Sequence, residues 1–207
     1  CAVDSGWFAA EITPVEVQVK GQRTAVDMDE TPGLCQPEKV AKLKPAFAPA
    51  GQPGSITPAS SSSISDGAAA LVLARADWAA QQGLQAQARI VAHSTHAAAP
   101  SRFPSAPIQA IESVLAQTGW SVNDVDLFEI NEAFAMVTML AMRALNLPHE
   151  KVNVNGGACA LGHPIGATGA RILVTLIHAL RRTGGRRGVA SLCIGGGEAT
   201  AMAIELI

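Results

Sequence analysis

Three short groups of polar residues interrupt apolar parts of the sequence, and each follows a predicted β-strand. They are the pair Asn131-Glu132, the His163 of a glycine-rich turn, and Cys193, which precedes three glycines that begin at Gly195. Sheets of α/β proteins place ligands beyond the ends of their strands, so these positions suit a binding site. A thiol, an imidazole and an amide together supply a base, a proton carrier or oxyanion donor, and a group that orients water. The glycines after the thiol allow backbone N–H groups to approach a developing oxyanion without obstruction by Cβ atoms.

Each group alone has a simpler structural explanation. Asn131 can cap a helix, His163 can satisfy backbone groups in its turn, and Cys193 can be a small buried hydrophobic residue. The combination of the three is more informative than any one of them.

Other candidate sites are weaker. His93 and His96 point to opposite faces of a strand and have no neighbouring carboxylate, so no metal site is expected. The glycines between 156 and 169 lack both the Lys-Ser/Thr pair of a P-loop and the pattern G-x-G-x-x-G, so a nucleotide hydrolase is not indicated. Cys1 would be an N-terminal nucleophile only if the chain arose by autoproteolysis, and a truncated start is the preferred interpretation.

Predicted strands and helices alternate from Arg89 onward, which is typical of a layered α/β domain. Ser105 is expected to cap the first helix and Gly119 to end it. The last two strands are separated by three glycines and predict a hairpin. The strands are expected at 88–93, 126–130, 151–155, 188–194 and 199–207, and the helices at 106–118, 131–147 and 169–182.

The first 63 residues are rich in proline and glycine and predict a loop-rich region. Alternating valines predict a half-buried strand at 15–19. The serine run 60–63 resembles a flexible linker, but it leads into the apolar segment 68–74, which is expected to be buried.

The composition excludes several classes of protein. The 207 residues are 48% hydrophobic, 15% charged and 4% aromatic, with a formal net charge of -2, which suits a soluble globular protein and gives no footprint for nucleic acid. No apolar run reaches the roughly 18 residues that cross a bilayer. Four cysteines without a C-x-x-C pair favour a reducing, cytoplasmic setting. Because the sequence starts with Cys1 rather than Met, a targeting peptide or upstream domain could be missing.

Three ordered motifs resemble the C-terminal motifs of the thiolase family. They are NEAFA at 131–135, NVNGGACALGHPIGATGAR at 153–171 and CIGGGEA at 193–199, and the segments at 6–15 and 64–73 also resemble thiolases. The resemblance implies an α/β, thiolase-like layered fold with one complete βαβαβαββ half and a loop-domain remnant. By this resemblance, residues 1–62 are the end of the loop domain, 63–84 the last part of the N-terminal half, and 85–207 the C-terminal half.

The resemblance also implies catalytic roles. Cys193 would be the acid/base thiol at the α-carbon, and His163 would activate the nucleophile and help to hold the thioester oxygen. Asn131 would fix a water that donates to the same oxygen, and the Gly195 amide would contribute to a second oxyanion hole. The family's nucleophilic cysteine has no counterpart in this sequence, because Cys1, Cys35 and Cys159 lie in no matching motif.

Substrate contacts follow from the same resemblance. Ser62, Ala133, Phe134 and Phe47 match positions along the pantetheine arm of coenzyme A. The substrates would be CoA thioesters, with no separate cofactor, and the family is usually a homo-dimer or homo-tetramer. The stretch 101–107 reads SRFPSAP where the family has MG-x-GP, so the acyl-chain preference stays open.

The resulting hypothesis is an acetyl-CoA C-acyltransferase of lipid metabolism that condenses or thiolyses 3-oxoacyl-CoA, with formation of acetoacetyl-CoA from two acetyl-CoA favoured. One alternative is a truncated CoA-binding or assembly module that lacks the nucleophile. Another is a condensing enzyme of fatty-acid or polyketide synthesis. Those enzymes typically place two histidines around the nucleophile, and the cysteine at position 193 favours thiolase.

Overall fold

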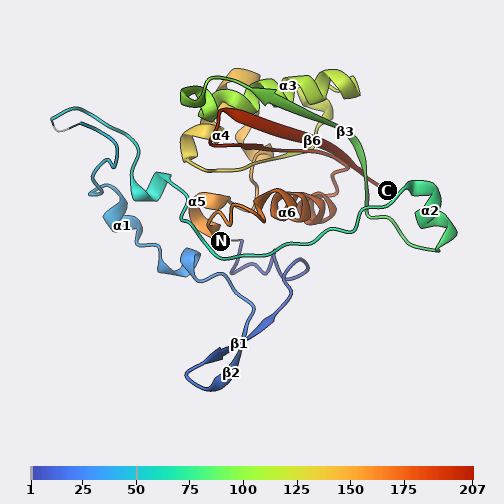
Figure 1. Cartoon of the computed structure of the whole chain (residues 1–207), viewed down its shortest axis with the longest axis horizontal. Helices are drawn as coiled ribbons and strands as arrows, with labels where there is room; N and C mark the ends of the chain where they lie inside the picture. Colours follow the sequence, from blue (N-terminus) through green and yellow to red (C-terminus); the bar gives the residue numbers. More distant parts are fainter. Residues whose placement is uncertain (1, 50) are drawn as a thin grey trace.

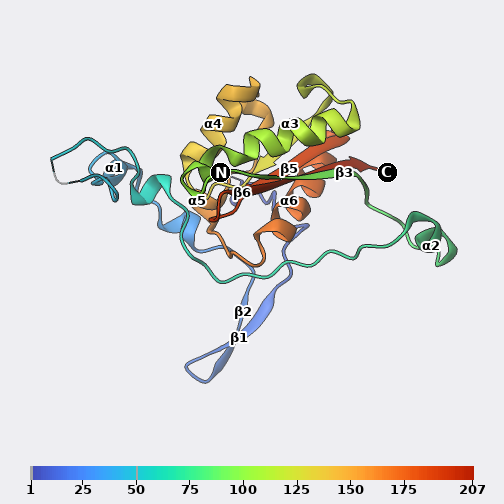
Figure 2. The same cartoon turned by 45° about the horizontal axis from the view of Figure 1, so that its top comes forward.

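A four-stranded mixed sheet lies at the centre of the fold (Figure 2), and its strand order is β3-β6-β5-β4. The structure is a computed structural model and describes residues 2–49 and 51–207. The strands are β3 (Ala88–Ala97), β4 (Leu127–Ile130), β5 (Arg187–Cys193) and β6 (Glu198–Leu206). Strand β6 is antiparallel to both neighbours, which confirms the predicted hairpin of β5 and β6, whereas β4 runs parallel to β5. The carboxyl ends of β4 and β5 therefore meet at the same end of the sheet.

Helices cover both faces of this sheet (Figures 1 and 2). They are α3 (Ala106–Thr118) and α4 (Ala135–Leu145) on one face and α6 (Thr168–Thr183) on the other. Successive side chains of a strand point to opposite faces, so Phe128 and Ile130 of β4 enter the core under α3 and α4, and Leu127 enters the core under α6. The layered α/β prediction is confirmed.

The ends of the helices follow local backbone rules. Gly119 ends α3 as predicted and Gly184 ends α6, with φ of 68° and 75°, which residues with a Cβ adopt at a cost. Ser105 occupies the N-cap position of α3 as predicted, but its hydroxyl does not cap the helix, because it donates to the Arg102 carbonyl over 3.0 Å. Residues 100–105 already form a 3-10 turn, and Pro107 in the first turn of α3 has no N–H to cap.

Two predicted elements differ from the structure. The strand at 151–155 is wrong, since only an isolated bridge joins Val152 to Phe128, and Asn153 turns the chain with a left-handed φ of 47°. The helix expected from residue 131 starts at Ala135, because the preceding residues are extended. The element order after residue 87 otherwise follows the βαβαβαββ pattern.

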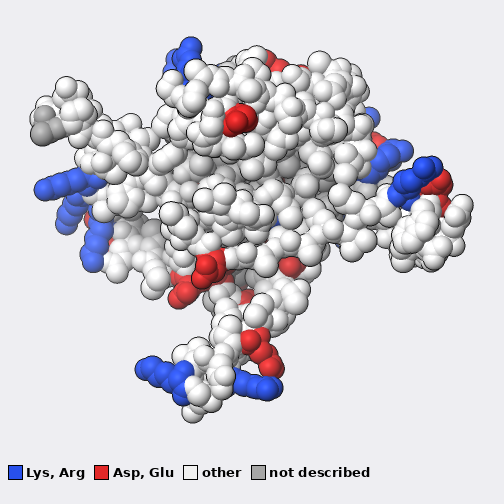
Figure 3. All heavy atoms as spheres, viewed as in Figure 1, with Lys and Arg blue, Asp and Glu red and all other residues white. Residues whose placement is uncertain are grey.

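The N-terminal region surrounds this core with short elements. Strands β1 (Val15–Val19) and β2 (Gln22–Val26) form a hairpin that projects from the body (Figure 1), which confirms the strand predicted at 15–19. The prediction that this strand is half-buried is wrong, because Val15 and Val19 are exposed on the projecting hairpin. Its turn is Lys20-Gly21, with φ of 49° and 84°, as a two-residue hairpin turn requires. Charged side chains gather on this hairpin and on the segment around α1 (Figure 3). The remaining elements are α1 (Pro37–Val40), α2 (Ala76–Gln81), α5 (Ala158–Leu161) and the 3-10 turns η1 (Thr31–Leu34), η2 (Pro58–Ser60), η3 (Pro100–Ser105), η4 (Val122–Asp124) and η5 (His149–Lys151).

The apolar segment 68–74 is extended and largely exposed, so the prediction that it is buried is wrong. Val72 and Leu73 are 93% and 72% exposed, and Ile64, which precedes the segment, is 92% exposed. The segment runs past α6 toward α2 (Figure 1), and all of its residues except Ala69 are exposed. Within residues 2–49 and 51–207, no helix is long and apolar enough to cross a membrane.

Candidate active site

His163 and Asn131, two of the predicted catalytic residues, lie together. The Nε2 atom of His163 is 3.4 Å from the Asn131 Nδ2 atom. The other ring nitrogen, Nδ1, is 2.7 Å from the hydroxyl oxygen of Thr168. The backbone at this residue is also held, because the His163 N–H donates to the Ser63 carbonyl over 2.9 Å. The preceding Gly162 has a φ of 91°, which a side chain would disfavour.

Asn131 is held at the end of β4 from both sides. Its N–H donates to the Ser191 carbonyl of β5 over 2.9 Å. On the other side, Asn153 takes the place of a neighbouring strand: the Ile130 N–H donates to its Oδ1 over 2.8 Å, and its Nδ2 donates to the Ile130 carbonyl over 2.8 Å. The Asn131 side chain is buried, and its Oδ1 has no hydrogen-bond partner among the described residues. This oxygen is available to a water or a substrate group.

Glu132 completes the support behind Asn131. Its carboxylate accepts hydrogen bonds from the Asn153 Nδ2 over 2.9 Å and from the Cys159 N–H over 3.1 Å. Gly157 packs directly on this carboxylate, and a Cβ at that position would overlap it. Burial, followed by the charge and hydrogen bond of Glu132, raises the pKa of the Cys159 thiol to about 12. Cys159 is therefore unsuited to be a nucleophile.

Cys193 is the last residue of the neighbouring strand β5, and Gly195 follows this strand. Because Ile130 pairs with Ser191, Asn131 and Cys193 lie at the same end of the sheet. The Cys193 side chain is buried, and burial raises its thiol pKa, so the resting group is a protonated thiol. Gly195 is exposed, and its N–H makes no hydrogen bond to the rest of the described chain.

The electrostatics around His163 favour its neutral form. Burial, and to a smaller degree the positive charge of Arg171, lowers the pKa of its imidazole below the ordinary 6.5. Arg171 also lies 3.9 Å from the carboxylate of buried Glu129. Burial raises the pKa of Glu129 to about 8, and the Arg171 charge opposes that shift. A neutral imidazole at pH 7 can accept a proton, as a general base must.

The four predicted substrate contacts also come together. The Ser62 N–H and hydroxyl both donate to the Ala133 carbonyl, over 3.1 Å and 3.0 Å. The rings of Phe47 and Phe134 meet edge to face with centroids 6.2 Å apart, and Phe47 is 71% exposed. Phe103, from the stretch whose sequence departs from the family, lies 6.2 Å from the same Phe134 ring. These residues form a partly exposed apolar surface with a hydroxyl at one edge.

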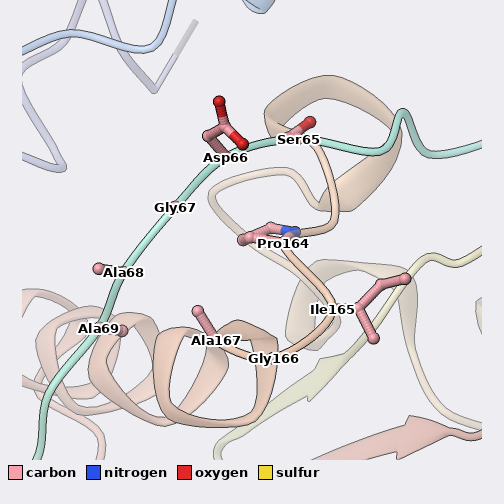
Figure 4. A pocket seen from close by; sticks show the side chains of 9 residues that line it. All are labelled: Ser65, Asp66, Gly67, Ala68, Ala69, Pro164, Ile165, Gly166 and Ala167. Atoms are coloured by element: carbon pink, nitrogen blue, oxygen red, sulfur yellow. The ribbon is translucent and has the colours of Figure 1, made fainter.

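The loop that immediately follows His163 lines an open cavity of about 430 Å³ (Figure 4). One wall is the extended segment 65–69 and the other is the loop 164–167. A Cβ on Gly67 would lie 2.8 Å from the Pro164 ring, so glycine allows the two walls to approach. The predicted site residues do not line this cavity.

Sequence reasoning missed three residues of this site. Thr168, Asn153 and Phe103 contact His163, Ile130 and Phe134, respectively. The motif at 153–171 contains Thr168 and Asn153, but the spacing alone does not show which side chains they meet. Cys35 is exposed, and Cys1 lies outside the described residues.

Comparison with known proteins identifies the family. The model of the thiolase C-terminal domain matches residues 84–206, and that of the thiolase N-terminal domain matches residues 1–77. The cytosolic acetyl-CoA acetyltransferase of Mus musculus is 50% identical over 205 residues, which are 99% of this chain and 51% of that protein. Acetyl-CoA acetyltransferase 2 of Arabidopsis thaliana is 46% identical over 208 residues, covering 100% and 51%.

Solved structures agree with these relatives. The acetyl-CoA acetyltransferase of Bacillus anthracis superposes with a TM-score of 0.94 at 44% identity, covering 100% of this chain and 52% of that one. Human mitochondrial 3-ketoacyl-CoA thiolase in complex with CoA superposes with a TM-score of 0.88 at 36% identity, covering 100% and 50%. The predicted thiolase-like fold is confirmed, and the chain spans about half the length of the relatives it matches. The division at residues 62 and 84 stays a prediction. The chain belongs to the thiolase family.

Proposed function

We propose that this chain is part of an acetyl-CoA C-acyltransferase that condenses two acetyl-CoA into acetoacetyl-CoA and CoA, or runs the reverse thiolysis. The contact of Asn131 with His163, at the end of the sheet where Cys193 also lies, is the observation that carries the proposal. Relatives named acetyl-CoA acetyltransferase support the choice of substrate. Two of these relatives are cytosolic acetyl-CoA acetyltransferases, which supports a cytosolic location.

In the first stage, a thiol supplied from outside these 207 residues gives its proton to the Nε2 of His163. The thiolate attacks the acetyl-CoA carbonyl, the C–S bond to CoA breaks, and the leaving CoA thiolate takes the proton from His163. The acetyl group is then a thioester of the enzyme. Neither a neutral imidazole nor this proton cycle needs a metal or a separate cofactor.

In the second stage, Cys193 first passes its thiol proton to the Nε2 of His163, and the resulting thiolate removes a proton from the methyl group of a second acetyl-CoA. The enolate oxygen is held by the protonated His163 and by a water on Asn131. Its carbon attacks the enzyme thioester, the tetrahedral oxyanion accepts a hydrogen bond from the Gly195 N–H, and the enzyme thiolate leaves and takes the proton from His163. In thiolysis, the protonated Cys193 thiol returns the proton to the α-carbon. Burial raises the pKa of this thiol and so favours its protonated form before the transfer.

Binding of coenzyme A is assigned to the surface around Phe134. Ser62 lies beside the polar part of the pantetheine arm, and Ala133, Phe134 and Phe47 lie beside its apolar part. Phe103 joins this surface from η3, so it belongs to the acyl or pantetheine side of the proposed site. A homo-oligomer, dimeric or tetrameric, is part of the proposal.

CoA-dependent thiolysis of acetoacetyl-CoA by the purified complete enzyme tests the proposal, because it requires acyl transfer, CoA binding and α-carbon protonation together. Activity that His163→Ala abolishes, with loss of both half-reactions, is the expected result. Binding of CoA without turnover would favour the alternative of a CoA-binding module. Absence of both would reject the proposed site.

A further inference from the structure

The Thr168 hydroxyl joins His163 to the start of α6. Thr168 is fully buried, and its Oγ1 lies 2.7 Å from His163 Nδ1 and 3.0 Å from the carbonyl oxygen of Pro164. A hydroxyl has a single hydrogen to donate, so its orientation decides whether Nδ1 faces a donor or an acceptor. The histidine tautomer and the threonine hydrogen therefore depend on each other.

Two other helical threonines donate to a carbonyl four residues earlier, as Thr168 is placed to do. Thr118 donates to the carbonyl of Val114, four residues earlier, over 3.0 Å, and Thr183 donates to that of Ala179 over 2.9 Å. Neither hydroxyl forms a hydrogen bond to a histidine among the described residues. Thr168 has the same arrangement toward Pro164, four residues earlier. If its hydrogen follows this pattern, Oγ1 presents a lone pair to Nδ1, and Nδ1 carries the proton.

The other side of the ring fits the same assignment. With Nδ1 protonated, Nε2 has a lone pair and accepts from the Asn131 Nδ2, 3.4 Å away. The Asn131 Oδ1 then remains open to accept from a water. In the opposite tautomer, an Nε2–H would point at the amide nitrogen, or the amide would rotate and bury its NH₂ group without this acceptor.

We propose that Thr168 is a positioning residue that holds His163 in the tautomer protonated at Nδ1. Nε2 is then the nitrogen that takes up the proton, and the Thr168 oxygen continues to accept from Nδ1–H when the ring becomes an imidazolium. The tautomer assignment stands on the hydrogen bonds alone. Its consequence for proton transfer rests on the proposed acyltransferase activity.

The tautomer is measured by ¹⁵N NMR of the protein labelled at its histidine nitrogens, at a pH above the titration of His163. The His163→Gln variant assigns the signals. The wild type and Thr168→Ser should show a protonated Nδ1 and a bare Nε2. Thr168→Val should shift the tautomer ratio roughly 10- to 100-fold toward Nε2–H, about 1.4–2.8 kcal/mol at 1.4 kcal/mol per factor of ten.

Thr183→Val is the matched control, because it removes a similar hydroxyl from the same helix without touching a histidine. It should leave the His163 signals unchanged. A wild-type protein protonated at Nε2 would overturn the proposal, whether or not the Thr168→Val variant folds. An unchanged ratio in a folded Thr168→Val variant would also overturn it.

Activity provides a separate readout in the complete enzyme. Thr168→Val should lower kcat for thiolysis roughly tenfold or more with little change in KM, and Thr168→Ser should restore it. If the NMR result holds but no variant or wild type shows thiolysis, the tautomer assignment survives and the proposed function fails. If thiolysis occurs but Nε2 is protonated, the proposed function survives and the tautomer assignment fails.

Discussion

The Asn153 side chain should contribute an unusually large part of the free energy of unfolding, because it stands in for a strand beside β4. Asn153→Ala removes three hydrogen bonds of 2.8 to 2.9 Å, two to the Ile130 backbone and one to Glu132. The Ile130 carbonyl keeps a hydrogen bond from the Thr138 hydroxyl, whereas the Ile130 N–H loses its hydrogen bond to the Asn153 Oδ1. At about 1 kcal/mol for each bond, the loss is about 3 kcal/mol.

The left-handed backbone at Asn153 adds a second destabilising effect to the Asn153→Ala change. A control variant with the same backbone strain allows this effect to be subtracted. Asn153 and Asn146 have φ of 47° and 52°, and alanine is disfavoured there by about 1–2 kcal/mol at either site. Asn146→Ala therefore imposes the same backbone strain without removing the bonds to Ile130 and Glu132. Urea unfolding followed by circular dichroism should place Asn153→Ala about 3 kcal/mol below Asn146→Ala. Equal losses of stability in the two variants, within about 0.5 kcal/mol, would refute the interpretation that the Asn153 side chain takes the place of a strand beside β4.

Three other changes probe the same region. In the complete enzyme, Cys193→Ser should preserve acylation of the nucleophile but slow condensation roughly 100-fold, measured as separate half-reactions. Burial raises the pKa of Glu129 from 4.5 to about 8, so the folded state holds a proton that the unfolded chain releases, and stability should fall between about pH 5 and pH 9. Glu129→Gln should reduce this slope in urea unfolding. Gly157→Ala should destabilise by about 1–3 kcal/mol, since its Cβ would overlap the Glu132 carboxylate, whereas Gly166→Ala, which meets open space, should change stability by less than about 1 kcal/mol.

Each of these predictions has a contrary result. Equal loss of both half-reactions would reject the separate role of Cys193. A pH slope unchanged by Glu129→Gln would show that other groups carry the linkage. Equal thermal midpoints for Gly157→Ala and Gly166→Ala would show that the Glu132 carboxylate moves aside.

Local sequence patterns were sufficient for most of the regular elements. Apolar periodicity located α3, α6 and the paired strands, and Gly119 marked a helix end, because these depend on residues a few positions apart. The predictions for segments 68–74 and 151–155 were wrong for different reasons. The first has an apolar composition but is largely exposed, and the second has alternating valines but a left-handed Asn153 that interrupts the strand.

The sequence by itself determined the family, the order of the elements and the identities of Asn131, His163 and Cys193, because long ordered motifs carry that information. Only the tertiary structure decided what these side chains touch. Thr168 meets the His163 ring through the turn into α6, and Asn153 reaches Ile130 across 23 positions. Such contacts depend on how β4, the loop after it and α6 pack together, and no spacing in the sequence specifies that packing.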